Sequence, residues 1–211
     1  MTTSEVFDAI KDALVAVAAV VTALVAIKGL NTWSRQLTGS AAFETARNLV
    51  RATLKVRDAL NGFRSPLIMG HEFPTGYRDI QRDYPEEHAR NQAYAEAWRQ
   101  MYNNRWEPVV SAVREFDSCS LEAEALWGQE IRLATNKLRG CVVDIYTAVD
   151  LIVEDKAEGG DIFHKDKVLA KKMRAVVAAS PKDKDNKLTQ DITAAIVAIE
   201  DFLKPHLRRA S

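Results

Sequence analysis

The chain contains few of the residues that build disulfide scaffolds and turn-rich folds. Two cysteines in 211 residues exclude a disulfide scaffold. Nine glycines and six prolines are too few to favour a loop-rich β fold. Hydrophobic residues at 47% and charged residues at 27% are ordinary values, which exclude a wholly disordered chain.

Charge of either sign is not in excess. Lys and Arg number 29, Asp and Glu also number 29, and the formal net charge is zero. Domains dedicated to nucleic acids normally carry a basic excess. We therefore expect no nucleic-acid partner.

Motifs for catalysis and for cofactor binding are also missing. The four histidines (His71, His88, His164 and His206) are scattered, and the two cysteines form no CxxC pair. No glycine-rich phosphate loop and no GxSxG nucleophile motif occurs. Cys141 lies on an apolar stripe, which is typical of a small core residue. The sequence therefore predicts no metal, no cofactor and no enzymatic activity.

What the chain does contain is one uncharged apolar run near its start, from Ala13 to Ile27. Fifteen residues are fewer than the roughly 20 that span a bilayer, but Lys28 can extend its side chain to the headgroups. Trp33 then stands where an interfacial aromatic residue belongs. We predict a transmembrane helix within residues 1–34. A signal peptide is disfavoured because acidic residues precede the run, whereas a buried helix of a soluble bundle remains an alternative.

The flanking charges predict the orientation of this span. Lys11 is the only basic side chain before the run, whereas Lys28, Arg35 and several further basic residues follow it. Basic residues favour the cytoplasmic side, so the N-terminus is expected outside and the rest of the chain in the cytoplasm, where thiols stay reduced. Lys28, Trp33 and Arg35 are the predicted membrane-interface residues.

Small residues also recur along one face of the predicted span. Ala16, Ala19, Ala23 and Ala26 follow a 3-4-3 spacing. Such rows let two membrane helices approach closely, so this face is a candidate association seam. Alanine is equally a common filler of such helices.

Residues 35–211 predict an antiparallel helical bundle with long helices of coiled-coil-like periodicity. Gly39–Ser40 is a plausible break, and a helix over residues 40–63 follows it. A second helix is expected from Pro85 to about Phe116, kinked or split at Pro108. A third, capped by Ser118 or Ser120, runs to about Glu158. The segment 162–180 fits a short helix or a short strand near 172–178, and a final helix covers residues 189–203.

The segment from Arg64 to Tyr84 interrupts the helical pattern. Loops of this length are uncommon in compact domains unless they bind something or serve as linkers. Its mixture of aromatic and ionisable side chains predicts an interaction loop, and a connector packed across the bundle end is the alternative. The candidate residues are His71, Glu72, Phe73, Tyr77 and Arg78.

Aromatic residues form a stripe on the second helix, at Tyr94, Trp98 and Tyr102, together with Met101. Helical spacing of this kind is typical of a core face, and a ligand pocket is the alternative.

Four segments carry a resemblance. They read WSRQLTG at 33–39, ARNLVRA at 46–52, KVRDA at 55–59 and IEDFLKP at 199–205. Together they resemble an uncharacterised group of bacterial proteins that have one N-terminal membrane helix and a cytoplasmic helical region. The resemblance implies a bacterial inner-membrane protein, and it implies no activity and no site residues.

The leading hypothesis is a non-enzymatic, membrane-anchored scaffold or interaction protein. Its partners would be the lipid bilayer and either another protein or a second copy of itself. One alternative is a membrane-tethered enzyme with a site around the 64–84 loop. Another is a soluble helical bundle in which residues 13–27 form a core helix.

Overall fold

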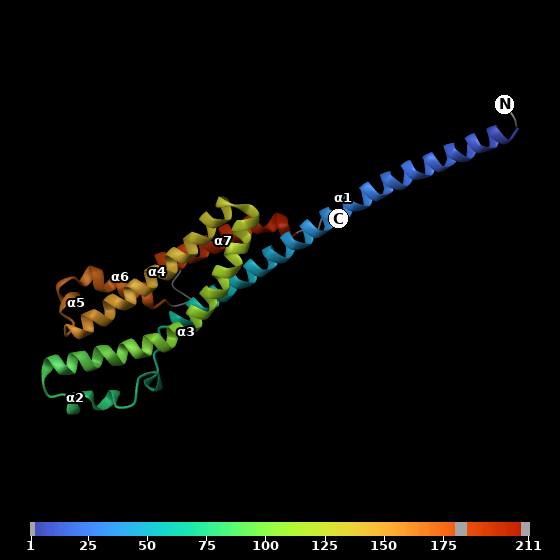
Figure 1. The fold of residues 1–211 in the computed structure, drawn as a ribbon. Coiled ribbons are helices and arrows are strands. Elements are labelled where there is room, and N and C mark those ends of the chain that lie inside the picture. Colours follow the sequence, from blue (N-terminus) through green and yellow to red (C-terminus); the bar gives the residue numbers. More distant parts are fainter. Residues whose placement is uncertain (1–2, 180–184, 208–211) are drawn as a thin grey trace. The chain divides into compact units, whose positions relative to one another are not determined.

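The computed structural model describes residues 3–179 and 185–207, and side chains are described from Val17 onward except at 31–32 and 35–38 (Figure 1). Every regular element within these residues is helical, which confirms the all-α prediction. The seam residue Ala16 and the interface residue Arg35 lie outside the described side chains. Contacts divide the chain into two compact units, one ending at Glu44 and one beginning at Thr45.

The first unit consists of the N-terminal part of α1, a helix assigned from Thr3 to Phe63. The break expected at Gly39–Ser40 is absent, because both residues are helical. A single glycine costs a helix only about 1 kcal/mol, which a long helix tolerates. Over the side chains that the structure describes, no helix is long and apolar enough to cross a bilayer.

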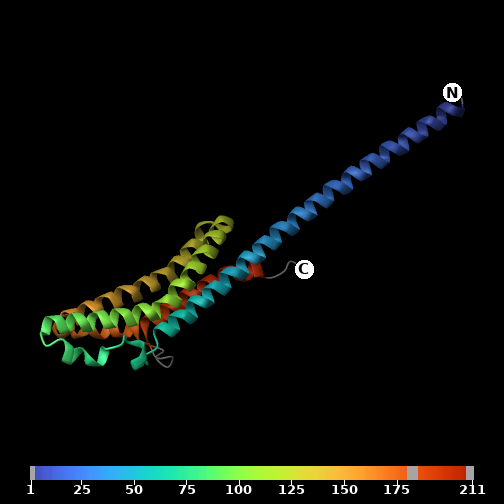
Figure 2. The same cartoon turned by 60° about the horizontal axis from the view of Figure 1, so that its bottom comes forward.

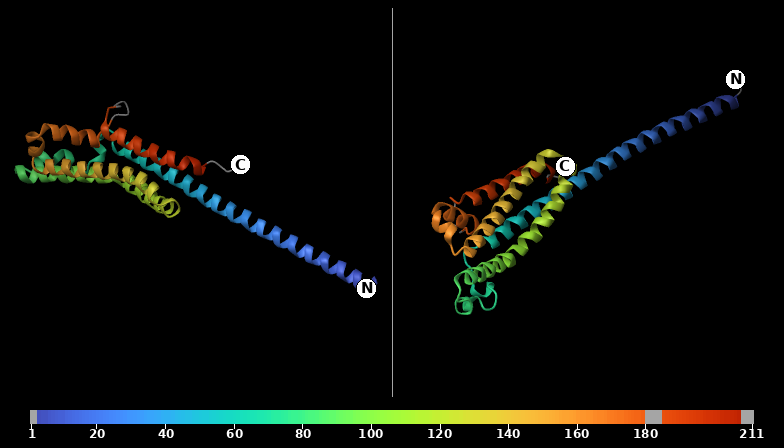
Figure 3. Two further views of the ribbon diagram at one scale, coloured as in Figure 1. Left: turned by 90° about the horizontal axis from the view of Figure 1, so that it is seen from above. Right: turned by 60° about the vertical axis from the view of Figure 1, so that its left-hand side comes forward.

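The second unit is a helical bundle built around a hairpin. Helix α3 (Glu87–Trp127) turns at Gly128 into α4 (Gln129–Ala157), and the two pack against each other (Figures 1 and 2). Helix α4 also packs against α6 (Lys167–Val177) and α7 (Lys187–Leu207). The last turns of α1 run beside α7, as the left view of Figure 3 shows.

The apolar stripes predicted from the sequence form the core of this bundle. On α1, Leu49, Thr53, Val56, Leu60 and Phe63 are all buried. Their 4-3-4-3 spacing in the sequence predicts one apolar face of a helix. The stripes on α4 and α7 are buried too, except that Ala134 on α4 is half-buried. The other members are Ile131, Leu138, Cys141, Ile145, Ala148 and Ile152 on α4, and Ile192, Ile196, Ile199 and Leu203 on α7.

The boundary between the second and third predicted helices was wrong. Helix α3 continues through Ser118 and Ser120 to Trp127. The hydroxyl of Ser120 is buried and donates to the carbonyl oxygen of Phe116 at 2.7 Å, a bond made inside a helix. Gly128 ends the helix instead, with φ of 70°. Pro108 does not split α3, although the ribbon bends along its length (Figure 1).

The alternative of a short strand near 172–178 was also wrong, because these residues belong to α6 and the turn after it. The Asp166 carboxylate caps α6 by accepting a hydrogen bond from the backbone N–H of Leu169 at 2.8 Å. Ala170 and Val177, two turns apart, are buried on one face, while the basic residues lie on exposed positions. That amphipathic pattern has the period of a helix.

Short helices occupy the segments between the long ones. The 64–84 segment contains the 3₁₀ helices η1 (Gly70–Glu72) and η2 (Tyr77–Asp79), followed by α2 (Ile80–Asp83). Helix α5 (Asp161–Lys165) lies between α4 and α6. Helix α7 extends past the predicted end and includes Pro205.

Candidate functional site

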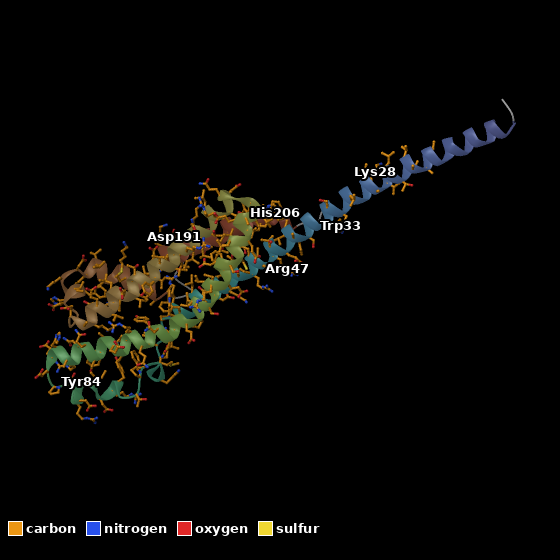
Figure 4. The ribbon with its side chains drawn as sticks, in the orientation of Figure 1. Lys28, Trp33, Arg47, Tyr84, Asp191 and His206 are labelled. Atoms are coloured by element: carbon orange, nitrogen blue, oxygen red, sulfur yellow. The ribbon has the colours of Figure 1, made fainter. Side chains whose placement is uncertain are left out.

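The described part of the first unit presents apolar side chains without burying them. Every residue from Val17 to Leu30 is exposed, including the seam residues Ala19, Ala23 and Ala26. The interface residues Lys28 and Trp33 project from α1 in Figure 4, and Trp33 is 61% exposed. The large apolar residues exposed in this unit are Val17, Val20, Val21, Leu24, Val25, Ile27, Leu30 and Trp33.

In the bundle, the predicted interaction loop is fastened to α3 by Arg105. Its guanidinium Nη2 donates to the Glu72 carboxylate at 2.8 Å and to the carbonyl oxygen of Leu67 at 2.6 Å. Its Nη1 donates to the Ser65 carbonyl oxygen at 3.0 Å, and its Nε donates to the second oxygen of Glu72. One guanidinium therefore holds both the start and the middle of the loop.

This ion pair determines the chemistry that is open to Glu72. The hydrogen bonds from Arg105 hold the pKa of the Glu72 carboxyl at about 2, against an ordinary value of 4.5. Glu72 is therefore ionised at neutral pH and is a poor general acid or base. It acts here as an anion that positions the loop.

Aromatic rings attach the rest of the loop to α3. Phe73 stacks on Tyr77 with ring centroids 4.0 Å apart and meets Trp98 edge-on at 5.2 Å. Tyr77 in turn meets Tyr94 edge-on at 5.9 Å. The stripe predicted on this helix therefore has two parts. Met101 and Tyr102 are buried in the core, whereas Tyr94 and Trp98 contact the aromatic rings of the loop.

The outer surface of the loop is hollowed. Four of the five predicted loop residues (His71, Phe73, Tyr77 and Arg78) line one open hollow of about 600 Å³. His71 and Arg78 are exposed, whereas Phe73 and Tyr77 are half-buried. The fifth residue, Glu72, is turned to Arg105 and does not line the hollow.

A smaller cavity of about 210 Å³ lies between the base of the loop and helices α3, α4, α5 and α6. Its aromatic wall consists of Phe63, Trp98, Tyr102 and Phe163. Four charged residues (Arg105, Asp155, Lys156 and Arg174) also line it.

Two of these charges are engaged by other groups. Arg105 is paired with Glu72, and the buried Asp155 accepts a hydrogen bond from the backbone N–H of Phe163 at 2.8 Å. The Lys156 ammonium lies over the Trp98 ring, 4.0 Å from its centroid, a cation–π contact. Burial lowers the pKa of Lys156, and the nearby positive charge of Arg174 lowers it further, whereas Asp155 raises it.

Nucleophilic and metal chemistry find little support in the described residues. Burial raises the pKa of both thiols, that of Cys141 to about 11, so both are protonated at neutral pH. Cys141 is buried as predicted, and both cysteines are free. No group of three potential metal ligands occurs in the part of the chain that the structure describes.

Sequence reasoning did not find Arg105, Lys156 and Arg174. Arg105 forms hydrogen bonds with residues 33 to 42 positions earlier in the chain, and no local sequence spacing predicts such a contact. Lys156 stands in the last turn of a helix, where a basic residue is ordinary. The one available signal was the basic face of α6, which contains no acidic residue.

Comparison with known proteins finds no matching family model, no matching curated protein and no matching solved structure.

Proposed function

We propose that this chain is a membrane-anchored helical interaction protein. The first part of α1 inserts into the bilayer, and the bundle presents its surface to a protein partner or to a second copy. The observation that carries the proposal is the exposure of the apolar run: Val17, Val20 and Leu24 are 57 to 60% exposed.

Energetics support insertion of this helix. Eight Val, Leu and Ile residues between Ala13 and Ile27 contribute about −0.3 to −0.6 kcal/mol each on a membrane-insertion scale. Left in water, the same residues would form an exposed apolar surface of the kind that marks a membrane or protein contact. The distribution of basic residues favours an external N-terminus and a bundle in the cytoplasm.

Alkaline carbonate extraction of bacterial membranes that contain the full chain tests the anchor. The chain is expected to stay in the pellet. A variant with Val20→Asp and Leu24→Asp is expected in the supernatant, because each aspartate near the centre of a span costs about 2.5–3.5 kcal/mol. Recovery of the unaltered chain in the supernatant would overturn the proposal.

A matched control comes from the bundle. Val143 is 60% exposed, as Val20 is, and Leu133 is 55% exposed. The variant with Val143→Asp and Leu133→Asp adds the same charges to the bundle surface, and it is expected to remain in the pellet. Fluorescent protein and alkaline phosphatase fused after Ser211 report the side, with fluorescence and no phosphatase activity expected.

The loop hollow around His71, Phe73, Tyr77 and Arg78 is the surface that we propose for the partner. Two rings are held in place by stacking, and two ionisable side chains stand exposed beside them. A tethered enzyme with a site in this loop is less well supported, because Glu72 is committed to Arg105. In-cell crosslinking from position 78 distinguishes a second copy from a different protein.

A further inference from the structure

The cavity between the loop base and α6 combines an apolar wall with unused positive charge. Phe63, Trp98, Tyr102 and Phe163 supply flat or edge-on ring surfaces around about 210 Å³. Pockets for drug-sized ligands measure about 300–1,000 Å³, so an occupant of this cavity is smaller than a drug molecule. Rings of this kind favour a planar apolar group.

Charge at the mouth of the cavity is positive. Lys156 and Arg174 line it and form no ion pair within the described ranges. Asp155, the one acidic residue of the lining, accepts from the Phe163 N–H. Asp155 attracts Lys156 only through space. The cavity also shares Asp155, Phe163 and Arg174 with a neighbouring hollow that Lys167 and Lys171 line.

The position of Lys156 favours an anion. Its ammonium is half-withdrawn from water and its only close described contact is the Trp98 ring. Burial and a neighbouring cation both disfavour its charged form. A bound carboxylate or phosphate would relieve both effects, because a charge-assisted hydrogen bond is about twice as strong as a neutral one.

We propose that this cavity binds a small organic anion with a planar apolar body, of the aromatic carboxylate class. The ring would lie among Phe63, Tyr102 and Phe163, and the carboxylate would bind the Lys156 ammonium and the Arg174 guanidinium. This site adjoins the loop hollow, with which it shares Ile68, and it does not depend on the membrane anchor.

The test titrates the full chain, dispersed in detergent micelles, with phenylacetate and indole-3-acetate. The tryptophan indole N–H signals are followed by NMR, with Trp98 assigned from Trp98→Phe. The Trp98 signal is expected to shift and saturate, while the Trp33 and Trp127 signals stay in place. The neutral amides of both probes are expected to bind at least about tenfold more weakly. Failure of both carboxylates to shift Trp98 would overturn the proposal, and so would equal binding of the amides.

Variants locate the anion. Lys156→Met and Arg174→Gln are each expected to weaken carboxylate binding by about tenfold, or about 1.4 kcal/mol. Lys172→Gln is the matched control for Arg174→Gln. Both residues stand on α6 and carry one positive charge, but Lys172 lines neither the cavity nor the neighbouring hollow. Ala178→Phe keeps every charge and fills the cavity, so it is expected to abolish binding. If Lys156→Met does not fold, the comparison of Arg174→Gln with Lys172→Gln still tests the proposal, because Arg174 is exposed.

The two proposals fail separately. Carbonate extraction reports only on α1, and the titration reports only on Trp98. Unchanged affinity in Arg174→Gln, or binding that persists in Ala178→Phe, would show that the probes bind elsewhere and would overturn this inference alone.

Discussion

Nη2 of Arg105 and Oε1 of Glu72 lie 2.8 Å apart, although the two residues are 33 positions apart in the chain. The pair is mostly removed from solvent, with side-chain exposures of 13% for Arg105 and 19% for Glu72. Arg105 also binds three carbonyl oxygens, that of Phe63 at the end of α1 and those of Ser65 and Leu67 in the loop. The loop is therefore part of the folded bundle.

The first prediction concerns acid stability. The folded-state pKa of Glu72, about 2, lies below its unfolded value of 4.5. The pair therefore stabilises the fold fully above pH 4.5 and loses its contribution as the pH falls from 4.5 to 2. Allowing for residual screening by solvent, we expect Glu72→Gln to lower the free energy of unfolding by about 1–3 kcal/mol at pH 7.

Urea unfolding at a series of pH values measures this effect. The difference between Glu72→Gln and the unaltered chain should shrink as the pH approaches 2. Glu107→Gln, an exposed change on α3, the helix that contains Arg105, is the control and should be close to neutral. A difference that stays constant across the pH series would contradict the ion-pair explanation.

The second prediction concerns Arg64, which is buried and donates to α6 and to the start of α7. It reaches the carbonyl oxygen of Val176 at 2.7 Å, Asn186 Oδ1 at 2.9 Å and Thr189 Oγ1 at 3.1 Å. Arg64→Met leaves these buried acceptors without this donor, so a loss of about 2–4 kcal/mol is expected.

Hydrogen exchange provides a local reading of the same change. The backbone N–H of Ala179 donates to the carbonyl oxygen of Arg64 at 3.0 Å and should exchange faster in Arg64→Met. Arg57→Met removes a half-buried arginine that pairs with its exposed neighbour Asp58, and it should cost no more than about 1 kcal/mol. Equal effects of the two substitutions would show that Arg64 is not a special contact.

The third prediction compares two glycines of the hairpin. Gly128 has φ of 70° and ψ of −145°, a conformation that side chains disfavour, so Gly128→Ala should cost about 1–3 kcal/mol. Gly140 is helical, and an added methyl group there would meet no atom within 4 Å. Gly140→Ala should therefore stabilise the bundle by up to about 1 kcal/mol. Thermal unfolding followed by circular dichroism measures whether each substitution raises or lowers the stability. A change in the same direction for both variants would contradict the assigned turn.

The fourth prediction tests the core of α4. Ile145 is fully buried, so Ile145→Ala should cost about 2–5 kcal/mol through lost burial and the cavity left behind. Val143 is 60% exposed on the same helix, and Val143→Ala should change stability by less than about 0.5 kcal/mol. Chemical denaturation of both variants checks the ranking, and a reversed order would contradict the register of α4.

Periodic burial was the part of this fold that the sequence could predict. The stripes on α1, α4 and α7 repeat every three or four residues, and their members are buried except Ala134, which is half-buried. The end of α3 could not be found in this way, because Ser120 resembles a cap yet forms a bond inside the helix. Four of the predicted loop residues line one hollow, whereas Glu72 was not recognised as an ion-pair partner.

The basic residues of the cavity escaped prediction for a different reason. Lys156 and Trp98 meet across two helices, and Arg174 joins them from a third. No fixed spacing connects such residues, so only the packed bundle reveals them. The short strand that the sequence allowed near 172–178 was excluded by the Asp166 cap and the two buried residues of α6.

The long reach of Arg64 has a consequence for synthesis on the ribosome. Its partners on α6 and α7 follow it by 111 to 125 residues. At about 5–20 residues per second, roughly 6 to 25 seconds pass before they are translated. During that interval the apolar stripe of α1 has no α7 to pack against, so the nascent chain offers it to chaperones.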